Sequence, residues 1–106
     1  MTDWLRVPDL VELMGLSPSR IRRLIEERML PATRRDGVLV VPADFLVDGA
    51  VLPELHGTAM LLADAGFRDD EIVSWLIEPE SSIGDTPVAA LRAGRKSLVR
   101  RVAQAL

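Results

Sequence analysis

Arginines crowd residues 20–35, where six of them stand against two glutamates and leave a net charge of +4. Three fall on a segment with helical spacing and two beside an Asp-Gly turn: Arg20, Arg22, Arg23, Arg34 and Arg35. A guanidinium group presents its N–H donors as a planar fork that matches phosphate oxygens and the major-groove edge of guanine. The chemistry that these residue types indicate is the binding of phosphate groups and base edges.

The other charges of the chain are also segregated. The 106 residues carry a net charge of −3. Residues 36–91 hold eleven acidic side chains and one cation, Arg68, whereas residues 92–101 hold five cations and no acid. Segregation of this kind lets one face attract an anion while the molecule stays acidic overall. The ordinary alternative, which composition alone favours, is that both basic segments are solvated helix faces.

Two short helices must position the first three arginines. Apolar residues at helical spacing before Gly15 predict a first helix, because glycine is a common C-terminal stop. Ser17 followed by Pro18 has the pattern of an N-cap and a first helical residue. The second helix, predicted over residues 17–28, places Ile21, Leu24 and Ile25 on its apolar face, with arginines on the opposite face.

A β-hairpin is predicted directly after the second helix. Residues 32–34 and 38–41 have strand-like composition and flank Arg35-Asp36-Gly37, and Asp-Gly between such runs is a strong hairpin signal. Pro42 is expected to end the second strand. A helix-turn-helix followed by a hairpin wing with arginine at its tip is a recurrent DNA-binding arrangement. The wing, residues 32–41, is expected on the DNA backbone or in the minor groove.

The remaining residues predict a helical bundle. Residues 43–52 have the composition of a connector, and helices are expected from Pro53 to about residue 65, from a cap at Asp69, from Thr86-Pro87, and after Gly94. The apolar residues expected to face inward include Trp75, Leu98 and Leu106. The fold expected is mainly α with a small β wing: a winged helix-turn-helix unit over residues 1–48, followed by a C-terminal helical unit over residues 49–106.

The first half resembles the MerR/excisionase type of winged helix-turn-helix. The resemblance rests on an aliphatic helix ending at Gly15, a second helix capped by Ser17, Leu-Pro-Ala at residues 30–32, a basic turn with Gly37, and a strand that closes at Pro42. It covers about residues 5–46 and implies DNA binding by this half.

One position departs from that pattern. Helices of this type usually end in Glu-Gly, whereas here Glu27 is followed by Arg28. If the backbone of Arg28 is left-handed, arginine costs about 1 kcal/mol relative to glycine. The alternative is that the helix continues for one more residue.

The second half is similar to the toxin-binding C-terminal domain of Xre/MbcA/ParS antitoxins. The shared features are Trp75-Leu76, a proline-bounded loop, the Thr86-Pro87 helix start and a closing amphipathic helix. The order of the two units resembles a family of small actinobacterial DNA-binding proteins. That resemblance implies DNA binding by the first half and leaves a toxin partner open.

The helix position of each candidate suggests its role. Side chains near the start of the second helix, namely Ser19, Arg20 and Arg23, are placed to meet base edges, and arginines such as Arg22 can also bind phosphates. The hydroxyl of Ser17 is expected to cap the helix, whose first amides can bind a phosphate.

Arg34 and Arg35 are expected at the wing tip, with an ordinary exposed hairpin as the alternative. The basic run of residues 92–101 stays open between a phosphate patch and a solvated face.

A second helix-turn-helix pattern, over residues 53–77, is not expected to contact DNA. Its second helix begins Asp69-Asp70-Glu71, and three carboxylates repel phosphate at the place where such a helix docks.

Other functional classes find little support in these residues. The chain has no cysteine and one histidine, His56, so no disulfide, no thiolate or histidine-cluster metal site and no catalytic triad is expected. We therefore expect neither an enzyme nor a cofactor. The longest apolar runs are four or five residues and the first residues lack a signal pattern, which indicates no membrane segment and a cytoplasmic protein.

The function expected from the sequence is double-stranded DNA binding in transcriptional control. The competing hypothesis is an antitoxin-like adaptor that binds a protein through residues 53–106. The basic first half favours DNA binding, whereas finding an exposed apolar groove around Trp75 and Leu98 would favour the adaptor. A single base-contacting helix often requires a homodimer for useful specificity, although no heptad pattern marks a dimer helix.

Overall fold

The computed structural model describes residues 2–106, and its elements follow the expected order. The helices are α1 (Val7–Met14), α2 (Pro18–Glu26), η1 (Ala43–Phe45, a 3-10 turn), α3 (Leu55–Asp64), α4 (Asp69–Ile77), α5 (Pro87–Arg92) and α6 (Lys96–Gln104). The strands are β1 (Trp4–Arg6), β2 (Thr33–Arg35), β3 (Val38–Pro42), β4 (Leu46–Val47) and β5 (Ala50–Val51). The mainly α fold with a small β wing is confirmed.

The helix-turn-helix is positioned by its caps. Gly15 ends α1 in the left-handed conformation, and its N–H donates to the carbonyl oxygen of Val11. The Ser17 hydroxyl accepts a hydrogen bond from the backbone N–H of Arg20 at 3.3 Å, so Ser17 is the N-cap of α2 as predicted. Ile21 is fully buried beneath α2, which turns the opposite face of this helix to solvent.

The sheet has one strand more than the sequence predicted. Its order is β1-β3-β2, all antiparallel, and β1 pairs with β3 in the register Leu5↔Val41. The predicted hairpin is present, with Asp36 and Gly37 both at positive φ, as a two-residue type I′ turn requires. No strand was predicted at β1, whose partner β3 lies 34 to 38 residues further along the chain.

The predicted connector over residues 43–52 contains a second small hairpin. Strands β4 and β5 pair across Asp48-Gly49, which repeats the Asp-Gly signal seen in the wing. A Cβ at residue 49 would lie 2.8 Å from the carbonyl oxygen of Leu13, so glycine permits this turn to approach the end of α1.

Three details of the helix ends and faces differ from expectation. Helix α2 ends at Glu26, not at residue 28, and Arg28 adopts φ of 55°. The cap of α4 is Arg68 rather than Asp69, because the Glu71 carboxylate reaches back to accept the Arg68 backbone N–H at 3.0 Å. Leu106 is 54% exposed because α6 ends at Gln104 and the chain leaves the core there.

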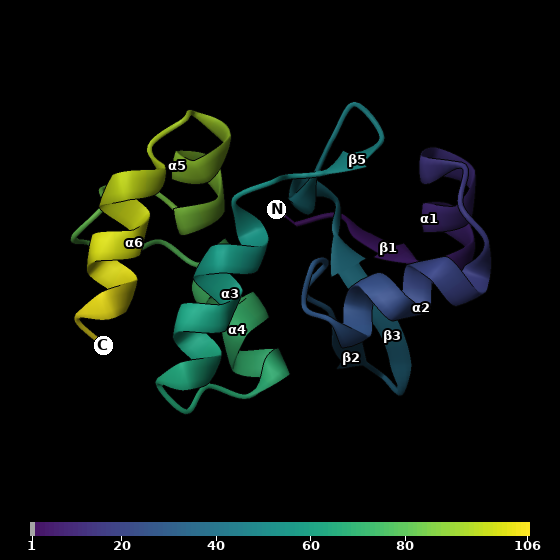
Figure 1. Cartoon of the computed structure of the whole chain (residues 1–106), viewed down its shortest axis with the longest axis horizontal. Helices are drawn as coiled ribbons and strands as arrows, with labels where there is room; N and C mark the ends of the chain where they lie inside the picture. The colour runs from purple at the N-terminus through teal and green to yellow at the C-terminus, as the bar shows by residue number, and fades with distance from the viewer. Residues whose placement is uncertain (1) are drawn as a thin grey trace.

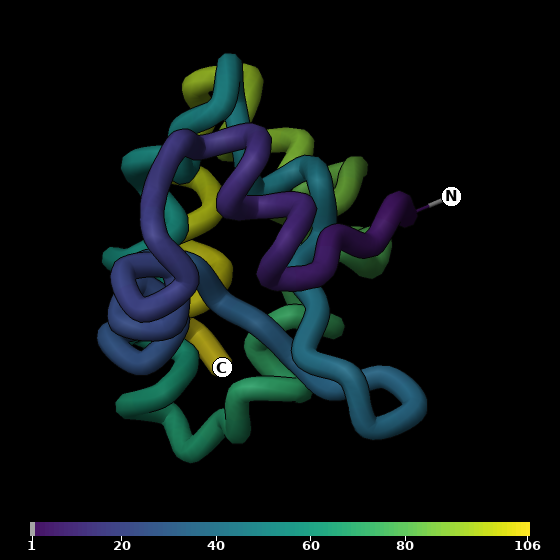
Figure 2. The backbone as a smooth tube through the Cα atoms, turned by 90° about the vertical axis from the view of Figure 1, so that its right-hand side faces the viewer, coloured from purple at the N-terminus to yellow at the C-terminus, as the bar shows by residue number. Residues whose placement is uncertain are grey.

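A continuous hydrophobic core joins the two halves of the chain. Buried side chains from α1, α2 and β3 belong to the same cluster as those from α3, α4, α5 and α6. Helix α4 packs against β2, and α5 against η1 (Figure 1). Arg92 strengthens the second contact, since its Nη1 donates to the carbonyl oxygens of Asp44 and Leu46 at 3.0 and 2.7 Å. Seen from the end that carries α1 and α2, α6 lies behind the other elements (Figure 2).

Candidate nucleic-acid interface

The exposed face of α2 has a crest and two flanks. Successive residues of a helix are rotated by about 100°, so Ser19 and Arg23 lie on the crest, opposite the buried Ile21. Arg22 and Arg20 lie on the two flanks of that crest, and all three arginines are exposed. The predicted outward face is therefore confirmed, and its members point in different directions.

One flank of α2 faces the wing across an open hollow of about 360 Å³. Three arginines line this hollow: Arg22 from α2, Arg34 from β2 and Arg6 from the end of β1. Nη1 of Arg34 donates to the carbonyl oxygen of Gly37 at 3.4 Å, which holds its side chain beside the wing turn. The lining of this hollow includes no acidic residue, so its charge is positive.

Arg6 is the candidate that the sequence analysis missed. It lies outside the basic stretch of residues 20–35, and only the pairing of β1 with β3 brings it beside Arg22 and Arg34. In the sequence, Arg6 stands three residues before Asp9, whose carboxylate accepts its backbone N–H at 2.8 Å. That spacing indicates a helix start, and nothing local indicates a phosphate contact.

The other flank of α2 borders a separate hollow of about 240 Å³. Arg20 and Arg23 line it together with Leu16, Leu24 and Glu27. Thus the structure brings Arg22 and Arg34 together at one hollow, and the flanking Arg20 and the crest residue Arg23 together at the other. The predicted residues do not form one cluster.

Arg35 is held on the opposite face of the sheet from Arg34. Its guanidinium carbon lies 4.5 Å from the centre of the Trp4 ring, which is a cation–π contact. Residues alternate between the two faces of a strand, so Arg34 points toward α2 while Arg35 points away from it. Trp4 is partly buried against the core, and its ring also contacts the Arg35 guanidinium.

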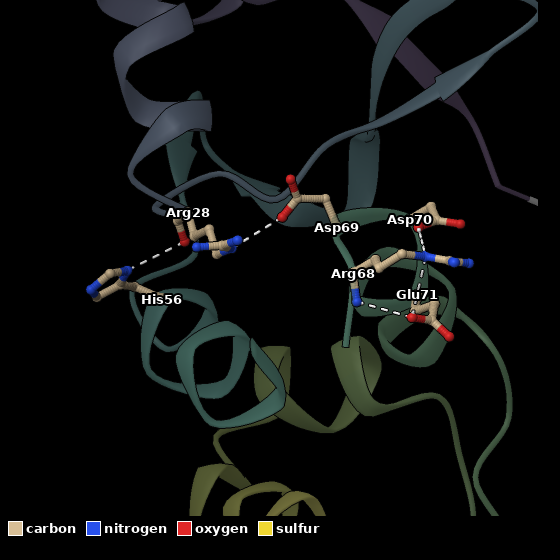
Figure 3. Close-up of polar contacts among 6 residues, drawn as sticks. All are labelled: Arg28, His56, Arg68, Asp69, Asp70 and Glu71. Carbon is tan, nitrogen blue, oxygen red and sulfur yellow. Dashed lines mark hydrogen bonds and ion pairs between the residues drawn. The ribbon is translucent and has the colours of Figure 1, made fainter. Parts of the chain in front are cut away.

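Helices α3 and α4 both contact Arg28, which follows the end of α2 (Figure 3). Nε of Arg28 lies 3.0 Å from Oδ1 of Asp69, and Nδ1 of His56 donates to the carbonyl oxygen of Arg28 at 3.3 Å. His56 comes from α3 and Asp69 from the start of α4. His56 therefore connects α3 to the residue that follows the end of α2, and Asp69 connects the start of α4 to the same residue.

Replacing Arg28 by glycine is expected to give a protein about 1 kcal/mol more stable than replacing it by alanine. Both variants lose the exposed ion pair with Asp69, which contributes about 0.2–1 kcal/mol. Glycine alone removes the left-handed strain at φ 55°. Chemical denaturation of the two variants measures the difference, and equal stabilities would contradict a strained backbone at Arg28.

Carboxylates mark one boundary of the interface. Asp69 and Asp70 line a further hollow together with Arg34 of β2, because α4 packs against the wing. Arg68 pairs with Asp70 and Glu71 at 3.4 and 3.5 Å. The start of α4 therefore presents negative charge beside the wing, which agrees with the expectation that the second helix-turn-helix does not dock on phosphate.

Across residues 2–106, no three His, Cys, Asp or Glu side chains are grouped closely enough to hold a metal ion. Within the same residues, no helix is both long and apolar enough to span a membrane.

Two family models together match nearly the whole chain. Residues 1–46 match the model described as "DNA-binding protein Rv2175c, wHTH domain", and residues 52–106 match "Rv2175c C-terminal domain of unknown function". The chain belongs to the Rv2175c family.

A relative and a solved structure agree with this assignment. The DNA-binding protein Rv2175c of Mycobacterium tuberculosis is 35% identical over an alignment of 113 residues. The alignment covers 94% of this chain and 77% of that protein. The NMR structure of Rv2175c has a TM-score of 0.87 and 34% identity, with coverage of 97% of this chain and 80% of that chain. Members of the Rv2175c family thus share both the winged helix-turn-helix and the helical unit that follows it.

Proposed function

We propose that this protein binds double-stranded DNA through α2 and the β2–β3 wing and acts in transcriptional control. The observation that carries the proposal is the arrangement of exposed arginines on both flanks of the α2 crest, with Arg6 and Arg34 beside one flank. Within residues 2–106, none of these arginines forms an ion pair with a carboxylate. The name of the M. tuberculosis relative and the family description support the same function.

The crest and the flanks have different roles in this proposal. The major groove is about 12 Å wide and admits one helix, so the crest residues Ser19 and Arg23 face the base edges. The flanking Arg20 and Arg22 then face the two phosphate backbones that border the groove. Pro18 has no N–H and that of Arg20 donates to Ser17, so the backbone N–H of Ser19 is left to bind a phosphate at the positive end of the helix.

The wing contributes contacts to the backbone or the minor groove. Arg34 and Arg6 extend the Arg22 flank along one strand, and their three guanidinium groups fit successive phosphate oxygens. The guanidinium of Arg35 lies over the Trp4 ring, and its N–H groups remain available to phosphate oxygens. These contacts provide affinity without distinguishing between bases.

We further propose that residues 1–48 form the DNA-binding unit and residues 49–106 a helical unit that supports it. The bounds of the two family models and the contacts of His56 and Asp69 with Arg28 support this division. An adaptor function is not proposed, because Trp75 and Leu98 are both partly buried and pack against the core.

The DNA affinity is expected to fall steeply with salt. Five arginines (Arg6, Arg20, Arg22, Arg34 and Arg35) are assigned to phosphates, and each phosphate contact lowers the slope of log K against log salt by about 0.9. A slope between about −3 and −5 is therefore expected from roughly four to six contacts. Gel-shift titrations with mixed genomic fragments at several salt concentrations measure it.

Arg95→Ala serves as a control for this experiment. Arg95 is exposed and directly precedes α6, at the end of the molecule opposite α2 (Figure 1), so the slope should stay unchanged. Binding that does not depend on salt, or an absence of binding at low salt, would reject the proposed function.

A further inference from the structure

The outer face of α6 is a second basic surface that the α2–wing contacts do not use. Positions separated by three or four residues share one face of a helix, and the buried Val99 and Ala103 define the inner face of α6. The exposed residues of α6, here called its outer arc, are Lys96, Ser97, Arg100, Arg101 and Gln104. Arg101 lies opposite the inner face, Arg100 lies on the flank beside α3, and Lys96 is exposed in the first turn. This arc holds three cations, two neutral polar residues and no acid.

The three cations of this arc are available to a ligand. Among residues 2–106, none of Lys96, Arg100 and Arg101 forms an ion pair with a carboxylate. Arg92, which belongs to the same basic run, is different because its guanidinium is held by the carbonyl oxygens of Asp44 and Leu46. The basic run therefore divides into one structural arginine and a set of free cations.

Arg100 is oriented by the neighbouring helix. A Cβ at Gly57 of α3 would lie 2.6 Å from Nη2 of Arg100, so the guanidinium rests on the surface of α3 in the space that glycine leaves. Lys96 and Arg100 are one helical turn apart. The cations thus extend from the start of α6 to its border with α3.

The α6 surface lies far from the α2–wing surface. The molecule measures 36 Å along its longest axis, with α1 and α2 toward one end of that axis and α6 at the other (Figure 1). In the view along that axis from the α1 and α2 end, α6 lies behind them (Figure 2). The acidic segment of residues 36–91 supplies α3 and α4, which lie between the two surfaces.

We propose that the outer face of α6 binds the phosphate backbone of a second DNA duplex, so that one chain joins two DNA segments. This inference rests on the proposed function, which supplies the first duplex. The α6 arc is basic and polar, with arginines and a lysine at helical spacing, and this composition fits an array of phosphates. Its location at the far end of the molecule places it away from a duplex that is bound to α2 and the wing.

The contact is to the backbone and carries no sequence preference. Helix α6 packs against both α3 and α5, which leaves only one face of it open. Lysine and arginine on that face neutralise phosphates, and such contacts depend on charge rather than on the base sequence.

A bead assay tests the proposal with the full chain. A duplex containing a preferred site is immobilised on beads, the protein is added, and the retention of a labelled free duplex is measured. Wild-type protein should retain the labelled duplex. K96Q/R100Q/R101Q should bind a single duplex within about twofold of wild type but retain the second duplex at least about tenfold less.

Two further variants serve as matched controls. K96R/R100K/R101K keeps the three charges and should retain the second duplex as wild type does, which separates charge from side-chain shape. R20Q/R22Q/R23Q removes the first surface and should weaken the binding of a single duplex. Thermal melting establishes that each variant is folded, and glutamine, a good helix former, preserves α6.

The outcomes separate this proposal from the one on which it rests. If wild type binds a single duplex and retains no second one, or if K96Q/R100Q/R101Q retains it fully, the α6 proposal is wrong while the DNA-binding function stands. If wild type binds no duplex at all, the proposed function itself is wrong. Retention of labelled RNA in place of the second DNA duplex would also reject the assignment of α6 to DNA.

Discussion

Arg23→Ala is expected to weaken binding to a preferred DNA site by about 1–3 kcal/mol, which is roughly a 5- to 150-fold loss of affinity. Arg23 lies on the crest of α2, where the proposed docking directs its guanidinium to a base edge. Binding to random DNA should change much less, because that binding depends on phosphate contacts. Competition gel shifts with a selected site and with random DNA measure the two losses.

The neighbouring Arg22→Ala is the matched control. Arg22 has the same side chain on the same helix but lies on the flank, beside Arg6 and Arg34. Its loss should lower the affinity for all DNA sequences to the same extent. It should also make the slope of log K against log salt shallower by about 0.9. Arg35→Ala, on the wing, should also lower the affinity for all DNA sequences to the same extent. If Arg23→Ala and Arg22→Ala both lower affinity uniformly, the assignment of base contacts to the crest is wrong, although DNA binding itself stands.

Trp75→Ala is expected to destabilise the protein by about 3–5 kcal/mol. Trp75 lies on α4, is half-buried, and packs against the cluster that contains the core residues of both halves. Native domains have only about 5–15 kcal/mol of stability, so the variant should lose a large share of it. Urea denaturation of the variant beside wild type measures the change.

Trp75→Phe distinguishes the packing of the ring from its polar group. The indole Nε1 of Trp75 is buried without a hydrogen-bond partner among the described residues. Phenylalanine removes that donor and keeps most of the ring, so its cost should stay below about 1.5 kcal/mol. If Trp75→Ala unfolds at the same urea concentration as wild type, the ring is not part of the core, and a partner surface becomes the better explanation for α4.

The predictions that succeeded depend on local interactions. The end of α1 and the start of α2 follow from Gly15 and from the Ser17-Pro18 pair, because a cap acts within one helical turn. The wing follows from Asp36-Gly37 for the same reason, since a two-residue turn fixes the register of its own strands. The β4–β5 hairpin was not predicted, because residues 43–52 were expected to be a connector, although Asp48-Gly49 carries the same Asp-Gly signal.

Other local predictions failed where two nearby residues compete for one role. Asp69 was predicted to cap α4, but the Glu71 carboxylate accepts the Arg68 N–H and shifts the cap by one residue. Asp69 is then free to pair with Arg28, 41 positions earlier in the chain. The sequence left two conformations open at Arg28. The left-handed one occurs together with the contacts that His56 and Asp69 make to that residue.

The sequence by itself determined the helix-turn-helix, the wing and the exposure of the α2 arginines, because caps, turns and the 3.6-residue period act between neighbours. Only the tertiary structure decided which arginines lie together. Pairing of β1 with β3 brings Arg6 beside Arg22 and Arg34, and strand alternation sends Arg35 to the opposite face, over Trp4. The physical reason is that positions far apart in the chain meet only through strand register and a shared core, and neither leaves a signal in the spacing of single residues.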